Sequence, residues 1–284
     1  MRFRAYEPCP RFPPLSLSES CMLHCRHCRG RYLKGMTTVA PPALLDHAMA
    51  LANHGAHGFL VSGGCDRRGR LLHLDEALDG LAAVRRRTNL VVAVHAGVVD
   101  DDVASRLLDA CDVAFADVVG SDETARQVIG LDSATPYRRS LQRLVDAGVP
   151  VTPHVTLGLH HGQIVGEHAA IDVIAALPVE KMVVNVICPT PATAFASVSP
   201  PPLPEIASLF EYAVERCGRV ALGCMRPRGR PDIERAAVAA GIRDIVLPSR
   251  ATRGMLASDD VVVERLPVCC GIPDGLVERS KNYI

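Results

Sequence analysis

Tryptophan is absent from this sequence, and aromatic residues make up only 4% of its 284 residues, a scarcity from which no function follows. An excess of one charge is also missing, because 31 Lys and Arg balance 31 Asp and Glu and no Lys/Arg-rich block occurs. We therefore expect no nucleic-acid partner. No apolar run is long enough to span a bilayer, and the first residues lack the apolar core of a secretory signal. We expect a cytoplasmic protein with no membrane partner.

What the chain does contain is apolar residues and cysteine. Hydrophobic residues make up 48% of it, which is enough to bury a large core. The chain has 11 cysteines. Since the cytosol keeps thiols reduced, they are better interpreted as metal ligands and buried thiols than as a disulfide framework.

Short β-rich runs alternate with helical patterns along the chain, which is typical of βα units that form a parallel sheet. The predicted strands are residues 15–18, 58–62, 90–95, 112–117, 151–158, 182–188, 219–223 and 244–247. The predicted helices are residues 41–54, 74–87, 101–110, 136–147, 164–177, 204–217 and 231–240. This pattern favours an α/β fold, a (β/α)8 TIM-type barrel over residues 1–250, with residues 251–284 as a C-terminal tail packing on the barrel. A doubly wound open sheet is the alternative.

Three cysteines follow the first predicted strand in the segment Cys-Met-Leu-His-Cys-Arg-His-Cys: Cys21, Cys25 and Cys28. Three thiolates on one loop can each bind one iron of a [4Fe–4S] cluster, which leaves the fourth iron without a protein ligand. A structural zinc site is the alternative, because His24 and His27 are interleaved with the thiolates. Zinc modules usually pair two short knuckles, whereas this triplet stands alone, so the spacing favours a cluster.

This Cys-x3-Cys-x2-Cys spacing resembles the motif of the radical S-adenosylmethionine (SAM) superfamily, in which an aromatic residue precedes the third cysteine. His27 holds that position here. The resemblance implies a barrel of the radical SAM kind in which SAM chelates the open iron. It further implies that an electron from a donor such as ferredoxin or flavodoxin leads to cleavage of SAM into methionine and a 5′-deoxyadenosyl radical. That radical would abstract hydrogen from a substrate.

Two further segments resemble SAM-binding motifs of that superfamily. Gly63 and Gly64 follow the second predicted strand and resemble its Gly-Gly-Glu motif, although Cys65 stands where the glutamate is usual. Glycines let a backbone approach a ligand closely. After the fifth predicted strand, the pattern in residues 162–166 resembles the segment that packs on adenine and ribose. We therefore expect these residues to contact SAM: Gly63, Gly64, Gly162, Ile164 and Gly166.

Other polar side chains fall at predicted strand ends, where the chemistry of a (β/α)8 barrel is located. Arg226 follows the seventh strand and can hold a carboxylate of SAM or substrate in a bidentate pair. Four histidines can act as general bases or bind ribose: His95, His154, His160 and His161. Asp117 can accept a hydrogen bond from ribose or substrate. Each of these alone is more often a satisfied polar residue, so no catalytic residue is assigned.

Cysteines beyond the triplet indicate a second cofactor. An auxiliary iron–sulfur cluster needs about four ligands gathered in space. Cys224 follows the seventh predicted strand, and Cys269 and Cys270 lie in a tail able to fold over the same end of the barrel. We expect these three cysteines to be its ligands.

The resemblance is closest to the biotin synthase and lipoyl synthase group, and within it to one of the two subunits of an archaeal-type lipoyl synthase. The cysteine segment and the late Gly-Cys-Met-Arg-Pro beginning at Gly223 carry this likeness. It implies sulfur insertion into an octanoylated carrier protein or peptide, together with a second radical SAM subunit.

Two alternatives remain open. One is a radical SAM enzyme without sulfur insertion, such as a mutase or a carbon–carbon bond-forming enzyme. The other is a non-catalytic zinc or iron–sulfur binding protein.

Overall fold

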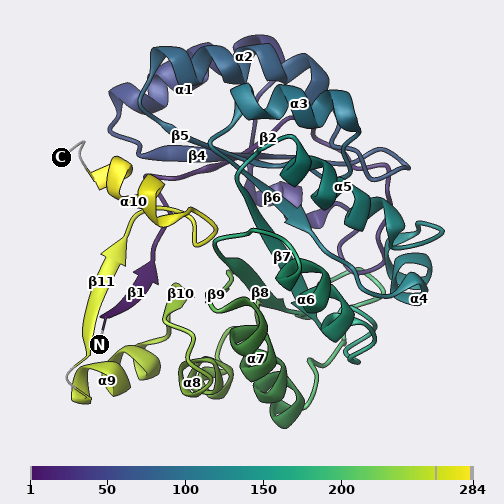
Figure 1. The fold of residues 1–284 in the computed structure, drawn as a ribbon, viewed down its shortest axis with the longest axis vertical. Coiled ribbons are helices and arrows are strands. Elements are labelled where there is room, and N and C mark those ends of the chain that lie inside the picture. The colour runs from purple at the N-terminus through teal and green to yellow at the C-terminus, as the bar shows by residue number, and fades with distance from the viewer. Residues whose placement is uncertain (1, 260, 282–284) are drawn as a thin grey trace.

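The computed structural model describes residues 2–259 and 261–281, along which strands alternate with helices (Figure 1). The strands are β1 (Arg2–Tyr6), β2 (Pro14–Ser16), β3 (Thr37–Thr38), β4 (Gly58–Ser62), β5 (Val91–His95), β6 (Val113–Asp117), β7 (Val151–Leu157), β8 (Met182–Val186), β9 (Val220–Leu222), β10 (Asp244–Val246) and β11 (Val262–Leu266). The α-helices are α1 (Leu44–Asn53), α2 (Leu74–Arg87), α3 (Asp101–Ala110), α4 (Asp122–Thr124), α5 (Thr135–Asp146), α6 (Glu167–Ala175), α7 (Leu203–Cys217), α8 (Pro231–Ala239), α9 (Arg250–Ser258) and α10 (Asp274–Lys281). Shorter helical turns are η1 (Arg31–Gly35), η2 (Pro41–Ala43) and the π-helical η3 (Ala125–Ile129).

The eight predicted strands are all present, as β2 and as β4 to β10. Each pairs with its neighbour in parallel, for example β4 with β5 through Val61 and Val94. The seven predicted helices are also present, with ends that differ by a few residues. The predicted α/β fold class is therefore confirmed.

The sheet has 11 strands in the order β11-β1-β10-β9-β8-β7-β6-β5-β4-β2-β3. It curls into a partial barrel with helices on its outer side (Figure 1). A closed ring of eight strands would pair β2 with β10, but in the described part of the chain β3 flanks β2 while β1 and β11 extend the sheet beyond β10. The predicted barrel is thus open along this line, because three strands that the sequence did not indicate lie at its edges.

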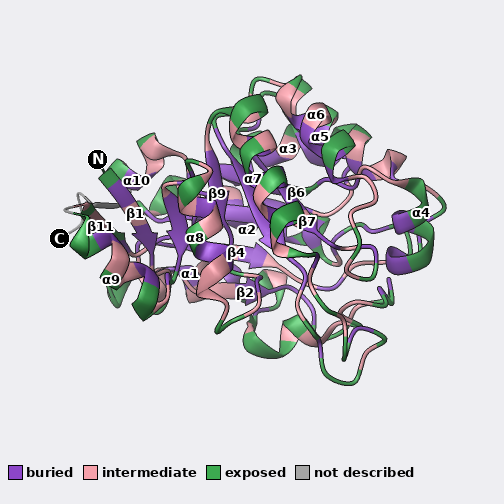
Figure 2. Ribbon diagram, turned by 90° about the horizontal axis from the view of Figure 1, so that it is seen from below, coloured by how far each residue is buried: buried purple, intermediate pink, exposed green. Residues whose placement is uncertain are grey.

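Alternation along the central strands separates two cores, since successive residues point to opposite sides of a sheet. In β5, Val92 and Val94 join the large core between sheet and helices, whereas Val91 and Ala93 face the inside of the curl. Figure 2 shows the buried sheet surrounded by helices whose outer faces are exposed. The strands thereby place alternate side chains inside the barrel.

A C-terminal segment fills part of that inside. Cys270 and Ile272 are buried with the inward-facing residues of the sheet. Thr152 Oγ1 donates a hydrogen bond to the Gly271 carbonyl at 2.6 Å, and Lys181 Nζ donates to the carbonyls of Cys270 and Ile272 at 3.1 and 3.2 Å. These bonds fix the segment after β11 inside the curl, next to the starts of β7 and β8. The division into a barrel of residues 1–250 and a tail of residues 251–284 stays a prediction.

The charge of Lys181 is buried and paired. Its Nζ lies 3.0 Å from Asp244 Oδ2, which also accepts hydrogen bonds from Arg219 at 3.1 Å and from the Tyr6 hydroxyl at 3.2 Å. A buried charge without such partners would be strongly destabilising. The network connects the end of β1 to the starts of β8, β9 and β10. None of the described helices is long and apolar enough to cross a bilayer.

Candidate functional site

The cysteine loop, residues 17–30, leaves the C-terminal end of β2. Its first cysteine is tied to the loop after β4: the Met22 amide donates to the Cys65 carbonyl at 2.7 Å, and the Cys65 amide donates to Cys21 Sγ at 3.2 Å. An amide hydrogen bond to a thiolate sulfur is one means by which proteins tune iron–sulfur sites. The structure therefore places Cys21 where its sulfur already has a backbone donor.

Gly64 permits this contact because no side chain fits there. A Cβ on Gly64 would lie 1.8 Å from the Ser20 carbonyl oxygen, and the Gly64 amide donates to Ser18 Oγ at 2.8 Å. Gly63 has a φ of 158°, in the region that favours glycine. The expected contacts of Gly63 and Gly64 with SAM stay a prediction, whereas their packing against the cysteine loop is observed.

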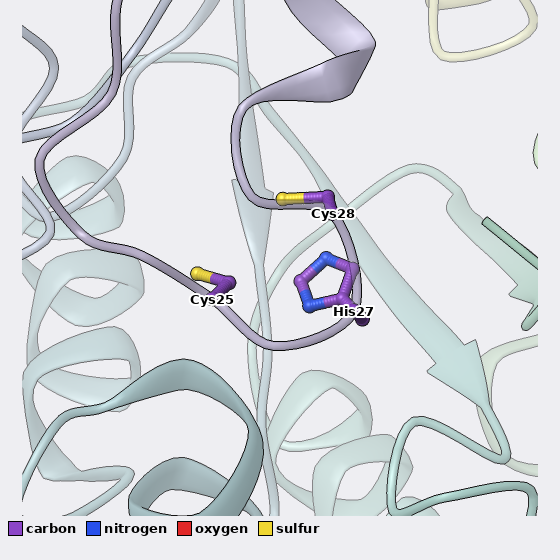
Figure 3. A group of neighbouring side chains, drawn as sticks. All are labelled: Cys25, His27 and Cys28. Carbon is purple, nitrogen blue, oxygen red and sulfur yellow. The ribbon is translucent and has the colours of Figure 1, made fainter. Parts of the chain in front are cut away.

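Cys25, His27 and Cys28 form a compact group of metal-donor side chains (Figure 3). Their candidate ligand atoms all lie within 4.8 Å of one another, and the three side chains are buried or half-buried. A hydrogen bond with Cys25 is the main cause that lowers the pKa of Cys28 to about 4, while the pKa of Cys25 is raised by the same bond. The lowered pKa favours the thiolate of Cys28, which is the form that binds metals.

Cys21 lies outside this compact group, so the structure gathers two of the three predicted cluster ligands together with His27. His27 Nδ1 is buried and lacks a hydrogen-bond partner of good geometry in the described residues. The donors present suit two kinds of occupant. Three thiolates of one loop suit a [4Fe–4S] cluster, for which Cys25 and Cys28 must separate to reach different irons. Two thiolates and an imidazole suit a single zinc ion.

The cysteine loop packs on a segment that the sequence did not predict. Leu23 and Cys25 are buried against Ala125 and Ile129 of η3. The Arg26 amide donates to the carbonyl of a residue in the same π-helical turn at 2.7 Å. Single π turns inside helical segments are frequent at functional sites. Here the turn forms the wall on which the second cysteine rests.

The loop after β7 is shaped by close packing. A Cβ on Gly162 would lie 2.1 Å from the Ser199 carbonyl oxygen, and one on Gly166 would lie 2.7 Å from Ser121 Cβ. The carboxylate of Glu167, the first residue of α6, accepts bonds from loop amides at 2.9 and 2.7 Å. Ile164 is half-buried in this loop. Contact of Gly162, Ile164 and Gly166 with SAM stays a prediction.

Arg226 is buried and bonded within the protein. Its guanidinium is 3% exposed and pairs with Glu234 at 2.7 Å. It also donates to the carbonyls of Gly223 and Val246, each at 2.7 Å, and to that of Leu247 at 3.2 Å. These bonds join the ends of β9 and β10 to α8. The expectation that Arg226 holds a carboxylate of SAM or substrate stays a prediction, whereas its bonds to Glu234 and to the three carbonyls are observed.

Three polar side chains project inward from neighbouring strand ends. His95 Nε2 lies 3.3 Å from Asp117 Oδ2, although the two are badly aligned for a hydrogen bond. The side chain of Asp117 is 50% exposed to solvent although Asp117 ends a central strand. It therefore faces solvent inside the curl. Desolvation opposes its ionisation, but the charge of His95 prevails and lowers the pKa of Asp117 to about 2.

His154 completes this group. Its ring centroid lies 5.6 Å from that of His95, and its Nδ1 bonds to the Thr152 carbonyl at 3.0 Å. Burial, aided by the charge of His95, lowers the pKa of His154 to about 4. The pKa of His95 is raised, because the charge of Asp117 outweighs desolvation. The sequence singled out these residues, and the structure brings them together, with His95 and Asp117 as a close pair and the imidazole of His154 beside them.

The cysteines expected to bind an auxiliary cluster lie near one another. A hydrogen bond with Cys270 is the main cause that lowers the pKa of Cys269 to about 7. Burial and the charge of Cys269 raise the pKa of Cys224, whose charge in turn contributes to raising that of Cys188. Within the described ranges, the compact donor group of three is Cys25, His27 and Cys28, so Cys224, Cys269 and Cys270 are neighbours without forming such a group.

The loop after β8 adds residues to which the sequence analysis assigned no role. Thr193 Oγ1 donates to the His27 carbonyl at 3.4 Å, and Tyr32 and Thr190 share a hydrogen bond at 3.2 Å. Phe195 lies edge-on to the His27 ring, with ring centroids 6.2 Å apart. The Pro-Thr-Pro sequence after this strand was the signal available, since such a loop is stiff and carries hydroxyls.

No protein-family model and no curated protein sequence matches the chain. Its fold, however, is shared with solved structures. HydG, a maturase of the [FeFe]-hydrogenase, is 13% identical, with a TM-score of 0.66 over 99% of this chain and 69% of that chain. SuiB of Streptococcus suis bound to S-adenosylmethionine is 12% identical, with a TM-score of 0.52 over 72% of this chain and 48% of that chain. TsrM of Kitasatospora setae, a radical S-adenosylmethionine methyltransferase with cobalamin and a [4Fe–4S] cluster bound, is 16% identical, with a TM-score of 0.50 over 70% of this chain and 37% of that chain. At these identities the likeness establishes that the chain has the fold of these proteins.

Proposed function

We propose that the protein is a radical SAM enzyme whose Cys21, Cys25 and Cys28 bind a [4Fe–4S] cluster with one open iron. The observation that carries the proposal is the position of these three thiols. They occupy one loop at the C-terminal edge of a curled parallel sheet, which is where barrel enzymes place their chemistry. When bound, the cluster and SAM would supply a 5′-deoxyadenosyl radical for C–H activation. The fold shared with HydG, SuiB and TsrM supports this proposal.

The chain's own residues would hold and orient these groups. The Cys65 amide donates a hydrogen bond to Cys21 Sγ at 3.2 Å. The loop around Gly64 brings backbone to within van der Waals distance of the cysteine loop, and the loop at residues 162–166 faces the same edge of the sheet. We propose that these two loops bind SAM. Inside the curl, the His95 and Asp117 pair can bind a polar group of the substrate.

The finer proposal is sulfur insertion in lipoyl cofactor synthesis, in the cytoplasm. An auxiliary cluster on Cys224, Cys269 and Cys270 would be the sulfur source, and an octanoylated carrier protein or peptide would be the substrate. A second radical SAM subunit and ferredoxin or flavodoxin are the further proposed partners. Support comes from the electrostatic influence of Cys269 on Cys224 and from the inward position of the segment that holds Cys269 and Cys270. A radical SAM reaction without sulfur insertion is the alternative, since these thiols are not gathered into a compact group.

A non-catalytic zinc protein is the second candidate, because one observation favours it. The sulfurs of Cys25 and Cys28 and a nitrogen of His27 are as close as the ligands of a single ion, and His27 Nδ1 has no other partner of good geometry in the described residues. The two candidates differ in whether His27 or Cys21 is needed for the metal.

Anaerobic reconstitution with iron and sulfide, followed by metal counting and a SAM cleavage assay, separates these proposals. A radical SAM enzyme binds about four irons at the triplet and releases 5′-deoxyadenosine with dithionite. Cys21→Ala abolishes both properties, whereas Cys217→Ala, which alters a half-buried thiol at the end of α7, leaves them unchanged. Zinc bound in place of iron, with the metal retained in Cys21→Ala, contradicts the proposal.

A further inference from the structure

The cysteine loop and η1 carry a local excess of positive charge in a chain that is neutral overall. Residues 20–45 contain four Lys or Arg residues and no Asp or Glu. The four cations are Arg26, Arg29, Arg31 and Lys34; we call them, with Met22 and Tyr32, the basic loop surface. Arg26, Arg29 and Lys34 are exposed, and Arg31 is half-exposed.

These cations lack the carboxylate partners that many other arginines of the chain have. Arg219, Arg226 and Arg230, for example, each pair with a carboxylate at 3.1 Å or less. Among the residues that the structure describes, the side chains of the four cations in the basic loop surface make no ion pair or hydrogen bond. Their charge is therefore available to an external partner.

Two exposed apolar side chains lie within the same surface. Met22 and Tyr32 are each 44% exposed, and they are two of the five large hydrophobic residues exposed in the described ranges. Arg, Tyr and Met are the residue types enriched in protein–protein interfaces, whereas a site for small anions needs only the cations. The composition indicates a protein partner.

An open groove connects this surface to the cysteines. Its volume is about 680 Å³, and Arg29, Arg31 and Lys34 line it together with Cys21. One carboxylate, Glu19, also lines it. A protein seated in the groove touches the side chain of a proposed cluster ligand, while the inward-facing His95 and Asp117 remain on the inner side of the sheet.

We propose that the basic loop surface docks an acidic one-electron carrier protein, an inference that rests on the proposed function. Each SAM cleavage requires one electron at the cluster. A reduced flavin of the carrier would pass from hydroquinone to semiquinone as the cluster gains that electron, and no bond to the protein forms or breaks. Complementary charge speeds and orients such an encounter, and contact at Cys21 brings the carrier beside the cluster.

The test uses a flavodoxin as the acidic carrier and the variant Arg31→Glu/Lys34→Glu. Both substitutions lie in η1, outside the cysteine triplet. The matched control is Arg86→Glu/Arg87→Glu, which makes the same change in charge at exposed cations at the end of α2. Flavodoxin binding is measured by calorimetry at low and high salt, and SAM cleavage is measured with reduced flavodoxin and, separately, with dithionite.

The proposal predicts that Arg31→Glu/Lys34→Glu weakens flavodoxin binding at low salt by about tenfold or more. It also predicts that flavodoxin-driven cleavage falls to a similar extent, that dithionite-driven cleavage is retained, and that the control behaves as the parent chain. Unchanged flavodoxin binding overturns the docking inference and leaves the proposed function standing. If Arg31→Glu/Lys34→Glu loses binding to an octanoylated carrier protein and not to flavodoxin, the surface docks the substrate protein and the docking inference is overturned. Failure of the parent chain to cleave SAM with dithionite refutes the proposed function itself.

If Arg31→Glu/Lys34→Glu loses iron, Lys34→Glu alone is used, because Lys34 lies six residues beyond Cys28. Flavodoxin binding by the apoprotein is then the deciding readout. Weaker binding than that of the parent chain supports the inference, and equal binding overturns it.

Discussion

The amide of Cys65 donates a hydrogen bond to Cys21 Sγ across 3.2 Å, linking the loop after β4 to the first cysteine of the triplet. Cys65 occupies the place where the resembling motif has glutamate, so its backbone, and not its side chain, makes this contact. Burial, followed by the charge of Cys21, raises the pKa of Cys65 to about 12. Cys65 therefore stays a neutral thiol beside the cysteines of the loop.

Gly64→Ala should disturb the cysteine loop. The new Cβ would lie 1.8 Å from the Ser20 carbonyl oxygen and 2.7 Å from Cys21 Cα, so backbone must move. We expect a loss of about 1–3 kcal/mol in the free energy of unfolding and a lower iron content after reconstitution. Gly254→Ala in α9 is the control, since its Cβ meets nothing within 4 Å and helix propensity should make it neutral or stabilising. Equal stability of the two variants would show that the loop adapts freely.

His27→Phe distinguishes the two metal proposals. Phenylalanine restores an aromatic residue before the third cysteine but offers no ligand atom. A cluster held by the three thiols keeps its iron in this variant, whereas a zinc ion held by Cys25, His27 and Cys28 loses a ligand and binds more weakly. Metal content by plasma mass spectrometry decides between them, and parent-level zinc in His27→Phe contradicts both assignments.

The stability of the protein should fall as the pH drops from about 7 to 4, because of His154. Its folded pKa of about 4 lies below the ordinary value of 6.5, so the unfolded state takes up the proton first. The contribution of His154 to the free energy of unfolding is fully present above its pKa in the unfolded state. It is lost as the pH falls towards its pKa in the folded state. By this linkage His154 alone accounts for a loss of about 2 kcal/mol between pH 8 and pH 5. Asp117, with a folded pKa of about 2, stays ionised throughout this window.

His154→Asn tests this expectation, because its amide can still donate to the Thr152 carbonyl but does not titrate. Urea unfolding at pH 8 and pH 5 should show a smaller loss in the variant than in the parent chain. An equal loss in both would assign the acid sensitivity to other groups.

Lys181→Met should release the C-terminal segment from the inside of the curl. The change removes the donor to the Cys270 and Ile272 carbonyls and one partner of the buried Asp244. Breaking a buried pair in this way typically costs about 3–5 kcal/mol. Hydrogen exchange should accelerate over residues 268–272 more than in β5. Arg250→Met, at the exposed start of α9, serves as the control. Unchanged exchange in this segment would mean that its apolar contacts suffice.

An auxiliary cluster can be sought with the triple variant Cys21/Cys25/Cys28→Ala, which removes the radical cluster site. If Cys224, Cys269 and Cys270 hold a second cluster, about four irons remain after anaerobic reconstitution and disappear with the further change Cys224→Ala. Mössbauer spectroscopy counts them. An iron-free triple variant refutes the auxiliary cluster, and with it the argument for sulfur insertion.

The parts of this molecule that the sequence predicts are those encoded by local pattern. β5 and β6 alternate between two buried faces and are rich in Val and Ala, and the cysteine triplet is a spacing on one loop. By contrast, β1 carries Arg2 and Arg4 and gains its place only by pairing with β10 and β11 at the edge of the sheet. Short edge strands with charged side chains carry little local signal.

The same limit applies to the site. Arg226 follows a strand, as an arginine that binds a ligand carboxylate would. Only the packing of α8 shows that Arg226 forms an ion pair with Glu234. The contact between the Cys65 amide and Cys21 crosses 44 residues of sequence, and the π-helical wall behind Cys25 has no distinctive composition. Such long-range pairings arise from tertiary packing, which a single sequence does not display.

The central claim is that the triplet supports reductive cleavage of SAM, and one assay tests it most directly. The anaerobically reconstituted chain is incubated with SAM and dithionite, and 5′-deoxyadenosine is measured by liquid chromatography and mass spectrometry beside Cys25→Ala and Cys217→Ala. We predict 5′-deoxyadenosine from the parent chain and from Cys217→Ala and none from Cys25→Ala. Equal product from Cys25→Ala, or none from a parent chain that carries its full iron, would contradict the account.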